Sequence, residues 1–218
     1  MNSQKPLSLI TTVLISLLVF SCQKDDLSND DSFNEQINSY EEYIYNDSDL
    51  SDYIYDQNKL HRFDIFISQE NLDILNNDPV AEEYVEGSLV FEGKIISNVG
   101  VRYKGSIGAW VGCLSNIDFS NPSGYKTCPK LSMKIKINSL EDRKFYGMNK
   151  LQFHSQNLDP SKMHERLGYY LYRNFGVTTA RSNHALIYIN GEFNGVFANT
   201  ENIDGPFTNT HFNNKGGN

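Results

Sequence analysis

The most regular pattern of hydrophobic and polar positions lies between Lys130 and Ile137. Every odd-numbered position in this stretch is apolar and every even-numbered position is polar, with lysines at 130, 134 and 136. Because side chains alternate between the two faces of a strand, this pattern predicts a strand with one buried face and one cationic face. Shorter apolar runs predict further strands at His61–Ser68, Leu89–Phe91, Ile95–Tyr103, Leu151–His154, His184–Ile189 and Gly195–Asn199.

Helical periodicity is clearest between Asp159 and Gly176. We expect Asp159 to cap this helix, Pro160 to occupy its first turn, and Gly176 to end it. The apolar side chains at positions 163, 167, 170, 171 and 175 recur at helical spacing and are expected to face the core. Glu165 and two tyrosines fall on the opposite side, which suggests that something covers that face as well.

Two turns and a second helix complete the expected fold. Gly93-Lys94 and Asn190-Gly191 should each join the two strands of a hairpin. A short helix is expected over Gln69–Leu75, with Ser68 as its N-cap. These elements predict an α+β fold with a mostly antiparallel sheet and one principal helix.

Charge is distributed unevenly along the 218 residues. Residues 23–60 contain 11 acidic and 2 basic residues, a net charge of −9, whereas residues 61–218 contain 16 of each and are neutral. We therefore expect an acidic tether over residues 22–60, whose tyrosines suggest that its second half docks on a domain over residues 61–218. No cluster of basic residues indicates a nucleic-acid partner.

The N-terminus has the pattern of a targeting segment. Lys5 precedes a short apolar stretch that ends in Val-Phe-Ser-Cys at Cys22. This ending resembles a bacterial lipoprotein cleavage box, which predicts a signal peptide over residues 1–21 and a membrane anchor through lipidation of Cys22. Ordinary secretion with a chance cysteine is the alternative. The residues that follow resemble an export signal of Bacteroidetes lipoproteins, so the expected location is the outer membrane or the cell surface.

The other two cysteines, Cys113 and Cys128, bracket a stretch rich in Gly, Ser and Asn. Outside the cytoplasm such a pair indicates a disulfide rather than a metal site. No His or acidic residue stands at metal-ligand spacing to them, and the sequence predicts no metal site.

Standard catalytic motifs are absent from the sequence: it has no Walker loop, no GxSxG, no HExxH, and no kinase HRD or DFG. The five histidines are scattered and are interpreted as surface or structural residues. Two groups of residues could carry chemistry. The first is the lysine face of residues 130–137 together with Arg102 and Lys104, which could bind phosphate or could be a solvated strand face. The second is Glu201 with Asp204, which could also be acids at a helix N-terminus.

Four segments resemble, in the same order, the blocks of the CotH family of secreted, atypical protein kinases. They are VGVRYKGS (Val99–Ser106), KLSMKIKI (Lys130–Ile137), DPSKMHERLGYYLYRNFGV (Asp159–Val177) and NGEFNGVFANTENID (Asn190–Asp204). The resemblance implies a lobe of a divergent kinase-like fold and a surface-anchored protein kinase. Such a kinase transfers phosphate from ATP, with Mg²⁺ or Mn²⁺, to Ser or Thr of a protein substrate.

The resemblance also implies roles for individual residues. Lys130 or Lys134 would contact phosphate, and Glu165 would be the helix acid that pairs with it. The other residues implied in cofactor binding are Arg102, Glu201 and Asp204. The family's catalytic and metal-binding aspartates would lie after Asn218, so the sequence is expected to be truncated before the catalytic lobe and leaves enzyme activity open.

A non-catalytic surface lipoprotein, which binds or scaffolds a protein or a glycan, is the alternative function. It is supported by the lack of a complete catalytic set and by Trp110, which is expected to be exposed. A lone tryptophan is more often a core residue.

Overall fold

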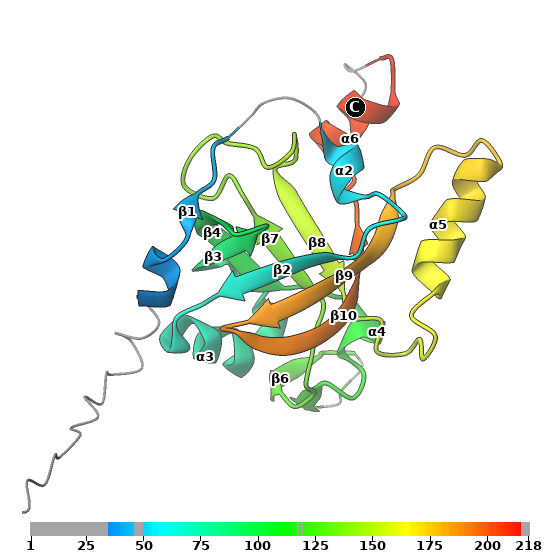
Figure 1. Cartoon of the computed structure of the whole chain (residues 1–218). Coiled ribbons are helices and arrows are strands. Elements are labelled where there is room, and N and C mark those ends of the chain that lie inside the picture. The colour runs from blue at the N-terminus through cyan, green and yellow to red at the C-terminus, as the bar shows by residue number, and fades with distance from the viewer. Residues whose placement is uncertain (1–34, 46–49, 117, 119, 215–218) are drawn as a thin grey trace, which may run out of the picture.

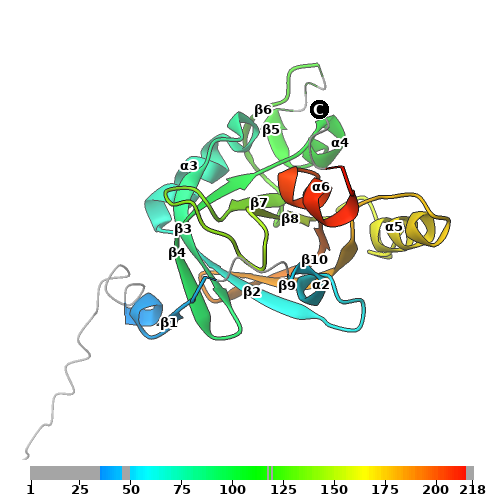
Figure 2. The same cartoon turned by 90° about the horizontal axis from the view of Figure 1, so that it is seen from above.

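The computed structural model describes residues 35–45, 50–116, 118 and 120–214. Its main feature is an eight-stranded sheet, seven strands of which close into a barrel in the order β4-β3-β2-β9-β10-β8-β7, with β7 pairing back to β4 (Figures 1 and 2). These strands are β2 (His61–Phe66), β3 (Val85–Phe91), β4 (Lys94–Tyr103), β7 (Met133–Lys136), β8 (Lys150–His154), β9 (Ser182–Ile189) and β10 (Glu192–Thr200). Within this barrel only the β2–β9 pair is parallel. The α+β class and the mostly antiparallel sheet are thus confirmed, and the closure is a feature that the sequence pattern did not predict.

The inside of the barrel is the hydrophobic core. Leu131, Met133, Ile135 and Ile137, the apolar positions of the alternating segment, are all at most 1% exposed. Aromatic rings fill the centre, where the ring of Phe63 lies 4.9 Å from that of Phe91 and 5.0 Å from that of Phe153. Because alternate side chains point to opposite faces, Lys134 and Lys136 of β7 lie outside the barrel.

Two tight turns set the register of the hairpins. Asn190 and Gly191 have φ of 50° and 83°, as a type I′ turn requires, and join β9 to β10. The β3–β4 turn is formed by Glu92 and Gly93, with φ of 50° and 77°. The expected turn at Gly93-Lys94 is therefore one residue too late, because Lys94 already pairs with Phe91 in β4.

The second half of the acidic segment is part of the fold. β1 (Glu41–Glu42) pairs in parallel with β4, and α2 (Ser51–Ile54) places Ile54 and Tyr55 in the core, where they are 0% and 3% exposed. The docking that the tyrosines suggested is thus present, and residue 61 is not a boundary between two parts of the structure. The expected signal peptide and Cys22 lie outside the described residues.

The smaller helices lie outside the barrel. They are α3 (Gln69–Asn77), η1 (Pro79–Ala81), α4 (Ile107–Trp110) and α6 (Gly205–His211), and a two-stranded sheet, β5 (Leu114–Asn116) with β6 (Ser123–Lys126), lies near α4. Ser68 caps α3 as expected, since its hydroxyl accepts a hydrogen bond from the N–H of Asn71 at 3.2 Å. Within the described residues, no helix has the length and apolar character needed to cross a membrane.

The principal helix, α5 (His164–Asn174), begins later than the sequence suggested. The Asp159 carboxylate does accept the first helical N–H, that of His164, at 2.9 Å, but Pro160 lies in the turn that precedes the helix. At the other end Gly176 has φ of 79°. The N–H of Gly176 bonds to the carbonyl of Arg173 and the N–H of Val177 to that of Tyr172, which together form a Schellman motif.

The apolar stripe of α5 does not face the core, contrary to the expectation. Its members are all at least 40% exposed: Met163, Leu167, Tyr170, Leu171 and Phe175. The polar side meets the barrel instead, where Glu165 accepts a hydrogen bond from Thr200 on β10. Arg166 donates to the side chain and the carbonyl of Gln57, in the segment between α2 and β2. The physical reason is that the outer face of the barrel is polar, so a polar helix face packs on it, and α5 stands beside the barrel in both views (Figures 1 and 2).

Candidate functional site

Basic side chains gather on the outer face of β4, β7 and β8. Arg102 and Lys134 are cross-strand partners in β4 and β7, Lys104 follows β4 directly, and Lys150 begins β8. We call these four residues the basic face. Each lies outside the barrel because its neighbours in sequence point into the core, as Tyr103 and Met133 do. The cationic strand face expected from the alternation is therefore formed.

The lysines of the basic face perturb one another. Burial lowers the pKa of Lys104, and the nearby charge of Lys134 lowers it further. Burial and the charges of Arg102 and Lys150 likewise lower the pKa of Lys134. Since like charges and desolvation both disfavour the ionised forms, an anion placed between these side chains would be stabilised.

Three acidic residues from three separate elements border the basic face. Glu82, which follows η1, pairs with the guanidinium of Arg102 and accepts the N–H of Gly105 at 2.9 Å. Asp204, at the N-terminus of α6, lies 4.0 Å from the ammonium of Lys150. Glu165, on α5, is the third.

Glu165 reaches the basic face through a histidine. Its Oε1 lies 2.5 Å from Nδ1 of His154 on β8, and Nε2 of the same ring lies 2.8 Å from the Nζ of Lys104. Thr200 on β10 also donates to Oε1 of Glu165, at 2.6 Å. Burial alone would raise the pKa of Glu165, but the hydrogen bonds from His154 and Thr200 outweigh it and hold that pKa below its usual range. Glu165 is therefore an ionised acid linked to a lysine of the sheet.

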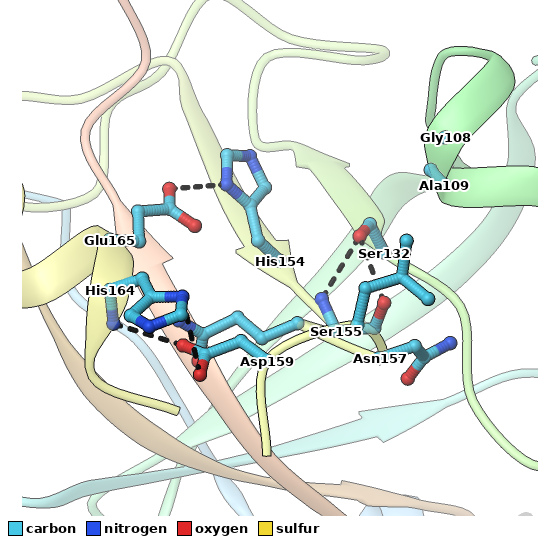
Figure 3. Close-up of a pocket in the computed structure, with 11 residues that line it drawn as sticks. Gly108, Ala109, Ser132, His154, Ser155, Asn157, Asp159, His164 and Glu165 are labelled. Atoms are coloured by element: carbon cyan, nitrogen blue, oxygen red, sulfur yellow. Dashed lines mark hydrogen bonds and ion pairs between the residues drawn. The ribbon is translucent and has the colours of Figure 1, made fainter. Parts of the chain in front are cut away.

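An open cavity of about 340 Å³ lies beside this link. Figure 3 shows His154 and Glu165 facing each other on one side of it, with Gly108 and Ala109 of α4 on another. Ser132 and Ser155 lie between them, and the Ser155 N–H donates to the Ser132 hydroxyl at 2.9 Å. A group of atoms in this cavity could thus approach the acid, the imidazole and two hydroxyls.

Two of the expected site residues, Lys130 and Glu201, lie away from the basic face. The ammonium of Lys130 donates to the carbonyl of Val196 at 2.7 Å and sits 4.5 Å from the centre of the ring of Phe197, a core residue. Lys130 departs from the alternation because β7 begins only at Met133. The structure thus separates Lys130 from Lys134, of which the sequence allowed either as the phosphate contact.

Glu201 is engaged in a buried ion pair. It is 4% exposed, and its carboxylate pairs with the guanidinium of Arg181 and lies 3.0 Å from Nε2 of His211. Arg181 in turn reaches Asp52 in α2 at 2.5 Å. Glu201 therefore ties α2 and α6 to the barrel, whereas Asp204 faces the basic face.

Sequence reasoning did not select His154 or Glu82, and it gave Lys104 no role of its own. His154 was interpreted as a scattered structural histidine, although it lies on the polar side of a strand next to the buried Phe153. The available signal was that His154 lies two residues after Gln152, so that both side chains share one face of the strand. Gln152 also accepts a hydrogen bond from Lys104, at 2.9 Å. Glu82 has a φ of 53°, which the sequence does not reveal.

The expected disulfide is confirmed, since Cys113 and Cys128 are bonded. Trp110 is 6% exposed and packs in the core, so it does not support a binding surface. Among the described residues, no group of three or more His, Cys, Asp or Glu side chains is placed to hold a metal ion.

Part of the sequence matches a known protein family. A family model described as CotH kinase protein matches residues 101–218, which is more than half of the chain and contains every residue of the basic face. No curated protein matches the chain.

Proposed function

The chain belongs to the CotH kinase family, and from this premise we propose that its basic face binds the phosphates of ATP. The reaction proposed is transfer of the terminal phosphate to Ser or Thr side chains of a protein. One observation carries the proposal, namely that Lys104, Lys134 and Arg102 converge on the outer face of the barrel with Glu165 linked to them through His154.

The chemistry of phosphoryl transfer fits such a face. Catalysis of this kind depends mainly on positioning the phosphates and stabilising their charge, for which a lysine supported by a helix acid is suited. Lys104 and Lys134 are partly buried and mutually repulsive, so an anion would relieve an unfavourable arrangement. The likeness of the barrel to one lobe of a divergent kinase-like fold is part of the same proposal.

A divalent metal, Mg²⁺ or Mn²⁺, would neutralise phosphate charge in such a reaction. The described residues supply the cationic contacts to phosphate but no cluster of metal ligands. We therefore assign this chain's residues to phosphate binding and derive no step through the metal.

Binding of ATP with Mg²⁺ or Mn²⁺, measured by calorimetry and thermal shift, tests the proposal. Lys134→Ala should weaken binding by at least about tenfold, as expected for loss of one charge-assisted contact. Lys130→Ala is the matched control, because it removes the same charge from the same segment but lies away from the basic face. Equal affinities of the two variants would overturn the assignment.

A protein-binding module remains the second candidate, and the exposed apolar stripe of α5 is the observation in its favour. Exposed apolar patches of this kind mark sites of protein association. Failure of ATP to shift the melting temperature of the folded protein, with either metal, would make this function the leading one.

Export to the outer membrane or cell surface, with an anchor at Cys22, belongs to the same proposal. It rests on the lipoprotein-like segment that ends at Cys22. Mass spectrometry of the mature N-terminus tests it, since a diacylated Cys22 is expected, and a Cys22→Ser variant should lose the lipid and leave the membrane fraction. An unmodified N-terminus upstream of Cys22 would contradict it.

A further inference from the structure

Hydrogen-bond roles in the Lys104–His154–Glu165 chain fix the state of the imidazole. An ionised carboxylate can only accept hydrogen bonds, so Nδ1 of His154, at 2.5 Å from Glu165, must carry a hydrogen. A lysine ammonium can only donate, so Nε2, at 2.8 Å from Lys104, must accept. Both contacts are satisfied together only by a neutral imidazole with its hydrogen on Nδ1.

Lys104 keeps one donor for a ligand in this arrangement. Its ammonium has three N–H groups, of which one points to Nε2 of His154 and one to Oε1 of Gln152 at 2.9 Å. The described residues offer no hydrogen-bond partner for the third. The two acceptors, His154 and Gln152, are uncharged, so they orient the ammonium of Lys104 without neutralising its charge.

We propose that His154 is a positioning residue, which holds Lys104 for contact with a phosphate group only while the imidazole is neutral. Protonation would place an N–H on Nε2, directed at the ammonium, and would bring two positive charges within hydrogen-bonding distance. Lys104 would then leave this position. The inference rests on the proposed function, and it adds that phosphate binding at this site weakens as the pH falls.

The titratable and charged groups that face His154 come from several elements. On α5, Oε1 of Glu165 lies 2.5 Å from Nδ1, and Asp159 and His164 line the same cavity. After β4, the ammonium of Lys104 lies 2.8 Å from Nε2 and is itself close to the charge of Lys134 on β7. Thr200, on β10, is neutral and donates to Glu165. In general, histidine is the side chain whose charge changes between about pH 5 and 8.

Two substitutions separate the two contacts of the ring. The terminal amide of glutamine can occupy the place of Nε2 and accept from Lys104 without ever becoming charged. Asparagine can occupy the place of Nδ1 and donate to Glu165, but it cannot reach Lys104. We therefore expect His154→Asn to bind ATP about tenfold more weakly than His154→Gln at pH 8, the loss typical of one hydrogen bond to a charged group.

The decisive experiment is calorimetric titration of the whole chain with ATP and Mg²⁺ between pH 8 and 5.5. ATP itself titrates in this range, but equally for every variant, so differences between profiles report on the protein. Wild-type affinity should fall about tenfold more than that of His154→Gln. His164→Gln is the control: its side chain is 81% exposed on the rim of the same cavity, and its profile should follow the wild type. Parallel profiles of wild type and His154→Gln, or equal binding by the Asn and Gln variants, would overturn the inference.

A second measurement keeps the inference separate from the proposed function. If wild type binds no ATP at any pH, the proposed function fails, but nitrogen NMR shifts of the His154 ring still report its state. A neutral ring with hydrogen on Nδ1 at pH 8 supports the positioning role, whereas hydrogen on Nε2 overturns it.

Discussion

Removal of the Glu201 carboxylate should destabilise the fold far more than removal of an exposed carboxylate such as that of Asp52. Glu201 is 4% exposed, and it accepts hydrogen bonds from the N–H of Arg181 at 3.1 Å and from its Nε at 3.0 Å. In Glu201→Ala the guanidinium of Arg181, in a residue only 8% exposed, would lose its buried partner. Breaking a buried ion pair on one side typically costs about 3–5 kcal/mol.

The structure places the expected loss at the lower end of that range. Arg181 would keep its contacts to Asp52 at 2.5 Å and to the hydroxyl of Ser51 at 2.9 Å, so its charge would not be left alone. We therefore expect the free energy of unfolding of Glu201→Ala to fall by about 3 kcal/mol. Urea unfolding at pH 7.5, followed by far-UV circular dichroism, measures this quantity.

Asp52→Ala provides the matched control. Asp52 pairs with the same arginine, but its side chain is 95% exposed, and exposed ion pairs contribute about 0–1 kcal/mol. The double variant Arg181→Met with Glu201→Leu should recover most of the loss, because removal of both charges leaves none of them buried and unpaired. A loss below about 1 kcal/mol in Glu201→Ala, or no recovery in the double variant, would refute the reasoning and return Glu201 to the candidate ligand-binding acids.

Three further predictions concern stability. Replacement of both Cys113 and Cys128 by Ser should lower the free energy of unfolding by about 3 kcal/mol, since the bond closes a loop with a separation of 15 residues; calorimetry that shows no loss would contradict this. Leu171→Ala, on the exposed stripe, should change stability by less than about 0.5 kcal/mol, whereas Phe153→Ala in the core should cost about 3–5 kcal/mol, and equal losses in urea would contradict the exposure of α5. Burial lowers the pKa of Lys130 to about 8 from 10.5, so the unfolded chain binds more protons between these values and stability should rise with pH from 8 upward. After allowance for solvent screening the rise is on the order of 1 kcal/mol, and Lys130→Met should flatten it in melts between pH 8 and 9.5.

Local sequence signals predicted the elements well where side-chain alternation or turn chemistry decides the backbone. The alternation around Met133 and Ile135 defined both the buried and the cationic face of β7, because neighbouring strand residues must point in opposite directions. Asn190-Gly191 predicted its hairpin because few residue pairs accept two positive φ angles. Both signals act over a few residues and need no knowledge of the rest of the fold.

The apolar stripe of α5 shows where such reasoning fails. Periodicity reports that Leu167 and Leu171 share one side of a helix, but it does not say what that side meets. The neighbouring barrel face is polar, so Glu165 and Arg166 pack inward and the leucines are 48% and 44% exposed. The orientation of an amphipathic helix is a property of the surface that receives it.

The candidate site divides in the same way. The sequence alone determined that Arg102, Lys134 and Glu165 carry the right charges, because residue type and strand periodicity fix the chemistry and the face. Only the tertiary structure decided which charges meet: closure of the barrel through β4 and β7 places Lys104 beside His154, and packing of α5 brings Glu165 to the same ring. The reason is physical, since residues 50 and 61 positions from Lys104 in sequence become neighbours only when strand pairing and helix packing are complete.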